Sequence, residues 1–237
     1  KPEATAFGSV ETYRRELIEK IVALGGYQSG DIPKAWSLRA RPELATCPPA
    51  AMVIAAATGG PAALQAFLMP IARRIEAPIL IIQHMPRTFT PVFAAKLEQA
   101  TGKHCREAVE GDILASGTML LAPGGYHMTL ERSGARYTVR INQDPPVNRH
   151  RPSVDVTFAS VARCAGANAV GVILTGMGGD GAKELLTMKQ AGAFTIAQDE
   201  ASCVVFGMPK EAIKAGAVDK VLPLSEIAGA ILAHVSR

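Results

Sequence analysis

The stretch MVIAAATGGPAAL, residues 52–64, decides the fold class of this chain. Its apolar run leads into Thr58-Gly59-Gly60-Pro61, and a helical pattern follows. A short apolar run that ends at glycines predicts a buried strand, and proline is favoured in the first turn of a helix. The stretch therefore predicts a strand, a tight loop and a helix, which would bring the residue at the tip, Ala57, to the edge of a sheet.

The same alternation continues along the chain. Further apolar runs predict buried strands, and the segments between or after them have helical patterns. The predicted strands cover residues 52–56, 78–83, 169–176 and 194–198, and the predicted helices lie near residues 61–75, 91–100, 154–164, 183–191 and 209–215. Strands that alternate with helices are joined by right-handed crossovers, so the predicted fold class is α/β: a mainly parallel, doubly wound sheet with helices on both faces.

The middle of the chain, about residues 105–150, departs from this pattern. The runs TMLLAP, YHMTLE and RYTVRIN predict short strands, and Gly-Gly and Ser-Gly pairs predict turns between them. We therefore expect a small antiparallel hairpin at the edge of the sheet.

The first 50 residues have a different organisation. Apolar residues recur at helical spacing from Val10 to Val22, Ser9 is suited to cap that helix, and Gly25-Gly26 ends the pattern. From residue 26 to residue 50, glycines and prolines replace the periodicity, which predicts a linker. Because the chain opens with a charged amphipathic stretch, we expect no signal peptide.

The composition argues against several classes of function. The 237 residues are 48% hydrophobic and 19% charged, with a net charge of +4 and no clustered basic patch, so we expect no nucleic-acid partner. The apolar runs are too short to cross a membrane, so we expect no membrane insertion. The four cysteines form no CxxC pair, which favours reduced thiols in the cytoplasm.

The glycine-rich loop and the histidines also fail the patterns of common cofactor sites. A dinucleotide site requires GxGxxG, and a P-loop requires Gly-Lys followed by Ser or Thr, whereas this loop is AAATGG. No histidine stands at a metal-ligand spacing. We therefore expect no cofactor and no metal.

Chemically useful side chains follow the predicted strands, at the edge where an open parallel sheet binds ligands. His84 follows the second strand, and Asp180 lies in TGMGGDGA after the third. Alone, His84 could be a structural residue, and Asp180 could simply cap the helix near Ala182. Together, a histidine and an aspartate suit the base and its orienting carboxylate in a nucleophilic site. The third member should be a serine or cysteine at the tip of the first strand, where Ala57 stands.

Five motifs in order resemble the bacterial chemotaxis receptor methylesterases, the CheB family. They are TGGP, QHMP, PPVNRHRPSVD (145–155), LTGMGGDGA (174–182) and QDEASCVVFGMP (198–209), and the resemblance covers about residues 51–223. It implies a Ser-His-Asp triad with His84 as general base, Asp180 as its orienting group and Ala57 at the position of the serine. It also places Thr58 and Met177 near the oxyanion region.

The resemblance further implies a substrate, a partner and a domain division. Family members hydrolyse glutamyl methyl esters on chemoreceptor helices and deamidate certain receptor glutamines. They carry a receiver domain that a histidine kinase regulates. Residues 1–25 would be the last helix of such a receiver, residues 26–50 the linker and residues 51–237 the catalytic domain, in a cytoplasmic protein.

Ala57 changes what the resemblance implies for activity. A methyl group has no lone pair and no proton, so we expect this chain to be nearly inactive as an esterase. The alternative is a natural, non-catalytic adaptor that binds a receptor or a regulator, although the intact His84 and Asp180 favour an alanine introduced into an active parent. Five further residues are candidates for substrate entry or for contact with acidic receptor surface, with ordinary packing, solvation or ion pairing as their alternative: Phe89, Phe93, Lys96, Arg149 and Arg151.

Overall fold

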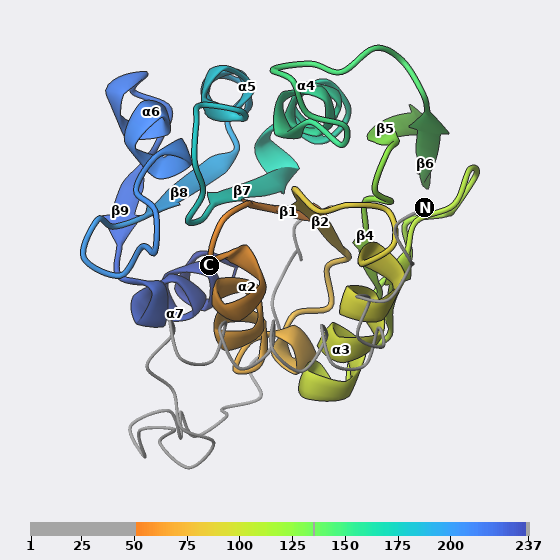
Figure 1. Ribbon diagram of the computed structural model, residues 1–237, viewed down its shortest axis with the longest axis horizontal. Helices are drawn as coiled ribbons and strands as arrows, with labels where there is room; N and C mark the ends of the chain where they lie inside the picture. Colours follow the sequence, from red (N-terminus) through yellow and green to blue (C-terminus); the bar gives the residue numbers. More distant parts are fainter. Residues whose placement is uncertain (1–50, 135, 236–237) are drawn as a thin grey trace, which may run out of the picture. The chain divides into compact units, whose positions relative to one another are not determined.

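A computed structural model describes residues 51–134 and 136–235. These residues form a seven-stranded sheet in which every neighbouring pair of strands is parallel, in the order β3-β4-β2-β1-β7-β8-β9 (Figure 1). The order reverses direction at β1, the point at which an open sheet leaves a crevice beyond its carboxyl edge. The strands are β1 Ala51–Ala56, β2 Ile79–Gln83, β3 Cys105–Glu107, β4 Met119–Leu121, β7 Ala169–Ile173, β8 Phe194–Gln198 and β9 Lys220–Leu222.

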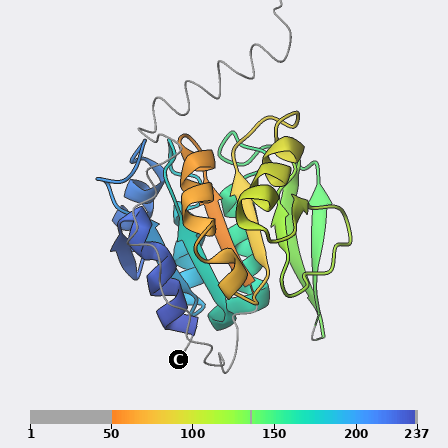
Figure 2. The same ribbon diagram turned by 90° about the horizontal axis from the view of Figure 1, so that it is seen from below.

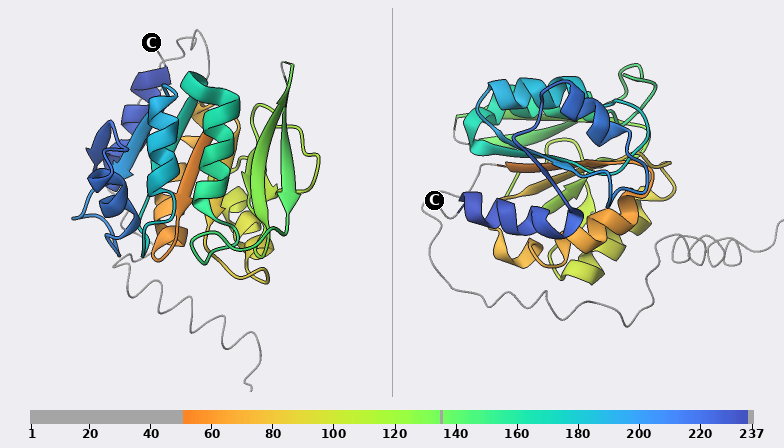
Figure 3. Two further views of the ribbon diagram at one scale, coloured as in Figure 1. Left: turned by 90° about the horizontal axis from the view of Figure 1, so that it is seen from above. Right: turned by 90° about the vertical axis from the view of Figure 1, so that its left-hand side faces the viewer.

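Helices cover both faces of this sheet, as the end-on view in Figure 3 shows. One face carries α2 (Gly60–Leu68), α3 (Thr90–Thr101) and α7 (Leu224–Val235), and the other carries α4 (Val154–Ala165), α5 (Ala182–Gln190) and α6 (Met208–Lys214). Short 3₁₀ turns lie at Ala72–Arg74 and Gly166–Asn168. The predicted doubly wound α/β class is confirmed.

The predicted antiparallel hairpin is present as a separate two-stranded sheet. Strands β5 (His127–Ser133) and β6 (Arg136–Asn142) pair in antiparallel register, and Figure 2 shows them beside the main sheet. The run TMLLAP is not part of the hairpin: β4 pairs in parallel with both β2 and β3 inside the main sheet. That placement explains why Met119–Leu121 is buried along its whole length, whereas β5 and β6 each keep exposed residues.

Several predicted boundaries differ from the structure. The helix predicted over residues 61–75 ends at Leu68, and a separate 3₁₀ turn follows Pro70, since Pro70 has no backbone N–H to continue the hydrogen bonds of the helix. The strand predicted over residues 169–176 ends at Ile173, where the chain turns into the loop that carries Asp180. Strands β3 and β9 and helix α7 lie outside the predicted elements.

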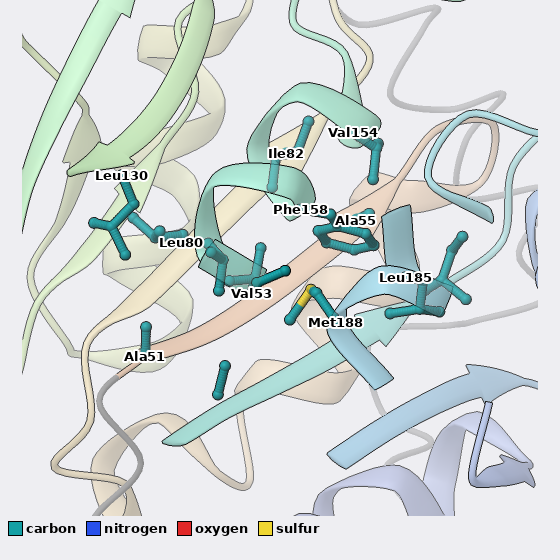
Figure 4. Close-up of a cluster of buried hydrophobic side chains, with 14 of the residues drawn as sticks. Ala51, Val53, Ala55, Leu80, Ile82, Leu130, Val154, Phe158, Leu185 and Met188 are labelled. Carbon is teal, nitrogen blue, oxygen red and sulfur yellow. The ribbon is translucent and has the colours of Figure 1, made fainter. Parts of the chain in front are cut away.

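The alternation of β1 decides which face each of its residues meets. Ala51, Val53 and Ala55 pack in the core under α4 and α5, while Met52 and Ile54 pack under α2 and α7. Figure 4 shows the first of these cores, in which Phe158 of α4 lies over Val53 and Ala55. Burying a side chain of that size contributes about 2–3 kcal/mol to stability. Ala57 continues the odd-numbered set and belongs to the same core.

The predicted receiver helix and linker lie outside the described residues. Within residues 51–134 and 136–235, no helix is long and apolar enough to cross a membrane.

Candidate active site

The register of β1 and β2 brings position 57 next to His84. Ala56 pairs with Gln83 at the ends of β1 and β2, and Ala57 and His84 are the residues that directly follow. Neighbouring strands lie about 4.8 Å apart. In β2 the even-numbered residues Leu80 and Ile82 pack in the same core as Ala57, so His84 continues the set that faces α4.

The side chain of Gln83 fixes the backbone at both Ala57 and His84. Its side-chain amide donates to the carbonyl of Ala57 at 2.9 Å and to the carbonyl of His84 at 3.0 Å. On the opposite side, the backbone N–H of Ala57 donates to the carbonyl of Thr175, which follows β7, at 3.0 Å. Position 57 is therefore anchored to both neighbouring strand ends.

Two glycines permit this close packing. Gly59, which precedes α2, has φ +80°, a conformation that glycine adopts without strain. At Gly176, a Cβ atom would lie 2.8 Å from the Ala57 Cβ and 2.4 Å from the Met208 sulfur. Only a residue without a side chain lets the loop after β7 approach Ala57 so closely.

His84 and Asp180 form a hydrogen-bonded pair. The Nε2 atom of His84 lies 2.8 Å from Oδ2 of Asp180, and the side chains are 10% and 0% exposed. The Nδ1 atom of His84 is buried and has no hydrogen-bond partner. The pairing leaves Nδ1 as the ring nitrogen that can act on another group.

Asp180 is held ionised by its surroundings. Burial alone raises the pKa of this carboxyl, but hydrogen bonds from His84, Asn148, the Val154 N–H and Ser153 outweigh the burial and lower the pKa to about 2. The Val154 N–H, at 2.7 Å, belongs to the first turn of α4, where the helix dipole also favours a negative charge. Asp180 can therefore orient His84 and balance a positive charge on it without taking up a proton.

The two acidic residues Asp155 and Asp180 cap each other's helices. Asp180, just before α5, accepts from the N-terminus of α4, whereas Asp155, in the first turn of α4, accepts at 3.1 Å from the N–H groups of Gly181 and Glu184 at the start of α5. Asn148 joins the two carboxylates, with its amide 2.6 Å from Asp155 and 2.8 Å from Asp180. The alternative that Asp180 caps its own helix is thus wrong.

A small pocket of about 270 Å³ opens beside His84. One wall is His150, whose ring stacks on the His84 ring with centroids 3.8 Å apart. Burial and then the neighbouring His84 lower the pKa of His150, and Asp180 opposes them. The lining residues are His84, Met85, Pro86, Arg149, His150, Arg151 and Pro152.

The other candidate residues divide between surface and core. Met177 is 72% exposed on the loop after β7, and Thr58 is exposed at the start of the loop after Ala57. Phe93 packs in the core of α2 and α3, which confirms ordinary packing there, whereas Phe89 and Lys96 are exposed. Neither Arg149 nor Arg151 forms an ion pair with Asp155 or Asp180 in this part of the chain.

Sequence reasoning assigned no role to Gln83, Asn148, His150 or Ser153. Gln83 is the first residue of QHMP and the last residue of β2. The other three lie in PPVNRHRPSVD, in an irregular segment where no periodicity indicates which side chain turns inward. Among residues 51–134 and 136–235, no group of three potential ligands could hold a metal ion.

Comparisons with known proteins agree with this geometry. The family model described as CheB methylesterase matches residues 52–231. A protein-glutamate methylesterase/protein-glutamine glutaminase of Anaeromyxobacter dehalogenans is 49% identical over 94% of this chain and 64% of its own length. One of Rhodospirillum rubrum is 55% identical over 76% of this chain and 49% of its own length. The chain thus spans about half to two thirds of these curated relatives.

A solved structure gives the same result for the fold. The CheB methylesterase catalytic domain of Thermotoga maritima superposes with a TM-score of 0.75 at 35% identity, covering 78% of this chain and 97% of the other. With a family model matching most of its length and relatives about 50% identical, this chain belongs to the CheB methylesterase family.

Proposed function

We propose that this chain is the catalytic part of a protein-glutamate methylesterase and protein-glutamine glutaminase of bacterial chemotaxis, with alanine at the position of its nucleophile. The observation that carries the proposal is the buried His84–Asp180 pair, placed by strand register beside position 57. The substrates would be glutamyl methyl esters and certain glutamines on chemoreceptor helices. Hydrolysis releases methanol from the ester and ammonia from the amide, and leaves a glutamate in both cases.

The proposed mechanism requires a hydroxyl at position 57. Its oxygen would attack the ester carbonyl while His84 takes the proton through Nδ1, and Asp180 would stay ionised and balance the charge. His84 would then return the proton to the departing methanol, and water would release the glutamate by the same steps. The backbone N–H groups of Thr58 and Met177, which have no acceptor in the described part of the chain, are our candidates for stabilising the oxyanion.

Ala57 removes the attacking atom and leaves the rest in place. In comparable hydrolases, loss of a triad member leaves roughly 10³–10⁴-fold catalysis over water. The chain would therefore be nearly inactive as it stands. The same alanine is the one observation in favour of a non-catalytic adaptor that holds a receptor helix or a regulator in this crevice.

The regulation that we propose depends on residues outside the described part of the chain. We assign residues 1–25 to the last helix of a receiver domain and residues 26–50 to the linker before the catalytic domain, in a cytoplasmic protein under a histidine kinase. The match to the Anaeromyxobacter relative covers a larger share of the chain than residues 51–237 make up, so the likeness extends into the first 50 residues.

Restoring the hydroxyl tests the activity. We expect Ala57→Ser to release methanol from methylated receptor and to react with a serine-directed sulfonyl fluoride, with the unaltered chain more than tenfold slower. Ala62→Ser is a matched control, because it adds a serine on the exposed side of α2, away from His84. If Ala57→Ser neither turns over nor is labelled, the esterase proposal fails, and retained binding of receptor would favour the adaptor.

A further inference from the structure

A second imidazole covers one face of His84. The rings of His84 and His150 are stacked with centroids 3.8 Å apart and planes 9° apart. The two residues come from distant parts of the chain: His84 follows β2, and His150 lies in the irregular segment between β6 and α4. Hydrogen bonds to an imidazole lie in the plane of its ring and cannot restrain its faces. The stacked His150 ring restrains one face of His84.

The segment that carries His150 is anchored to the same carboxylates that hold His84. The backbones of Val147 and His150 bond to each other at 3.1 and 2.9 Å, which closes a tight loop. Between them, Asn148 donates to both Asp155 and Asp180. The position of the His150 ring is therefore fixed relative to the carboxylate that His84 pairs with.

His84 needs such support because its hydrogen bonds alone do not fix it. Nε2 bonds to Asp180, but Nδ1 has no partner. A ring held at one nitrogen can rotate about that bond, and a base that is displaced by about 1 Å can lose on the order of 10²-fold in rate. A planar group packed on the ring face removes this freedom.

The stack also suits the charge that His84 would carry during the reaction. A positive imidazolium is attracted to the face of a neutral aromatic ring. The charged and titratable groups around the stack are Asp180 on one side, Arg149 and Arg151 along the pocket, and Asp155 behind Asn148. Burial and the proximity of His84 lower the pKa of His150, while Asp180 opposes them, and the net shift favours the neutral form of the His150 ring.

We propose that His150 is a positioning residue, whose neutral ring holds His84 in line with Asp180 and position 57. Its effect on turnover rests on the proposed function. Its effect on the His84–Asp180 hydrogen bond does not, so the two can be tested separately.

The first experiment uses the chain as it stands and needs no activity. An N–H proton shared between an imidazole and a carboxylate gives a far-downfield NMR resonance, which His84→Gln would assign to this pair. We expect that resonance in the parent, its loss or broadening in His150→Ala, and its return in His150→Phe, which keeps a neutral planar ring. His104→Ala is the control, because His104 pairs with Glu98 at the surface and should leave the resonance unchanged.

The second experiment measures turnover in the Ala57→Ser background. His150→Ala should lower kcat by about 10- to 100-fold, with a smaller effect on KM, and His150→Phe should recover most of the loss. If His150→Ala lowers the melting temperature, the His150→Leu variant is measured in its place, since leucine fills the space of the ring without offering a planar face.

The outcomes separate the two proposals. An unchanged resonance in His150→Ala, a resonance absent from the parent, or a failure of phenylalanine to restore it would overturn the positioning role. An inactive Ala57→Ser variant with the expected NMR pattern would overturn the proposed function and leave the positioning role standing.

Discussion

Replacing Asp180 with asparagine should lower the free energy of unfolding by about 2–4 kcal/mol at neutral pH. The side chain is buried, and both carboxylate oxygens accept hydrogen bonds: Oδ1 from Asn148 and Ser153, Oδ2 from His84 and the Val154 N–H. Asparagine has one acceptor oxygen, so its NH₂ group must face donors on one of these sides. Buried donors that lose their acceptor account for most of the expected loss.

The pH dependence of the unfolding free energy measures independently how much the ionised Asp180 carboxylate stabilises the fold. The pKa of Asp180 is lowered from 3.8 to about 2 in the folded chain. Because folding depresses this pKa, the charge contributes stability above about pH 5, roughly 2 kcal/mol, and that stability is lost as the pH falls through 3.8 towards 2. At pH 3 about 1 kcal/mol should remain.

Urea unfolding of the parent and of Asp180→Asn between pH 7 and pH 3 measures both quantities. The gap between the two proteins should narrow by about 1 kcal/mol over that range, with similar m values. Glu98→Gln is the matched control: it removes the carboxylate of a surface histidine pair, His104–Glu98, and should change stability by less than about 1 kcal/mol. Equal stability of Asp180→Asn and the parent at pH 7, or a gap that stays constant down to pH 3, would refute the reasoning.

Three further substitutions test the surroundings of the site by urea unfolding. Gly176→Ala should destabilise the chain by about 1–3 kcal/mol, because its Cβ would lie 2.4 Å from the Met208 sulfur; a neutral result would contradict the close approach. Gly229→Ala should instead stabilise by about 0.5–1 kcal/mol, since this exposed position inside α7 has open space and no positive φ. Asp155→Ala should cost about 1–2 kcal/mol by uncapping α5, and a change below 0.5 kcal/mol, roughly the effect of an ordinary surface substitution, would exclude that role.

The sequence predicted the fold class and the central strands because those depend on local patterns. The runs at residues 52–56, 78–83 and 194–198 are mostly apolar, which is typical of strands buried on both faces. Strands β3 and β9 have three residues each and carry exposed side chains, so neither length nor periodicity distinguishes them from loop. Helix α7 did leave a signal in the helical spacing of its buried Ile227 and Ile231, which the predicted elements omitted.

The prediction of His84 and Asp180 as partners used a property of parallel sheets, that the strand ends meet at one edge. The structure places the two residues together as that argument required. The partners of this pair could not be found in the same way. Asn148 reaches Asp155 and Asp180 from a segment whose backbone takes positive φ at residues 148 and 149, a conformation that no periodicity indicates. His150 follows that turn and depends on it for its position.

The reciprocal caps explain how a site can remain organised around an alanine. Asp180 receives its donors from α4 and Asp155 receives its donors from α5, so both carboxylates are held by contacts that also stabilise the two helix ends. Ala57 contributes nothing to these contacts, because its backbone is fixed separately by Gln83 and Thr175. The helix termini that stabilise the fold thus keep the carboxylate ionised and placed to bond one nitrogen of the His84 imidazole, whether or not position 57 carries a hydroxyl. Under the proposed mechanism, alanine at position 57 lacks only the attacking atom, while His84 and Asp180 stay assembled, so a single change at position 57 is sufficient to test the proposed chemistry.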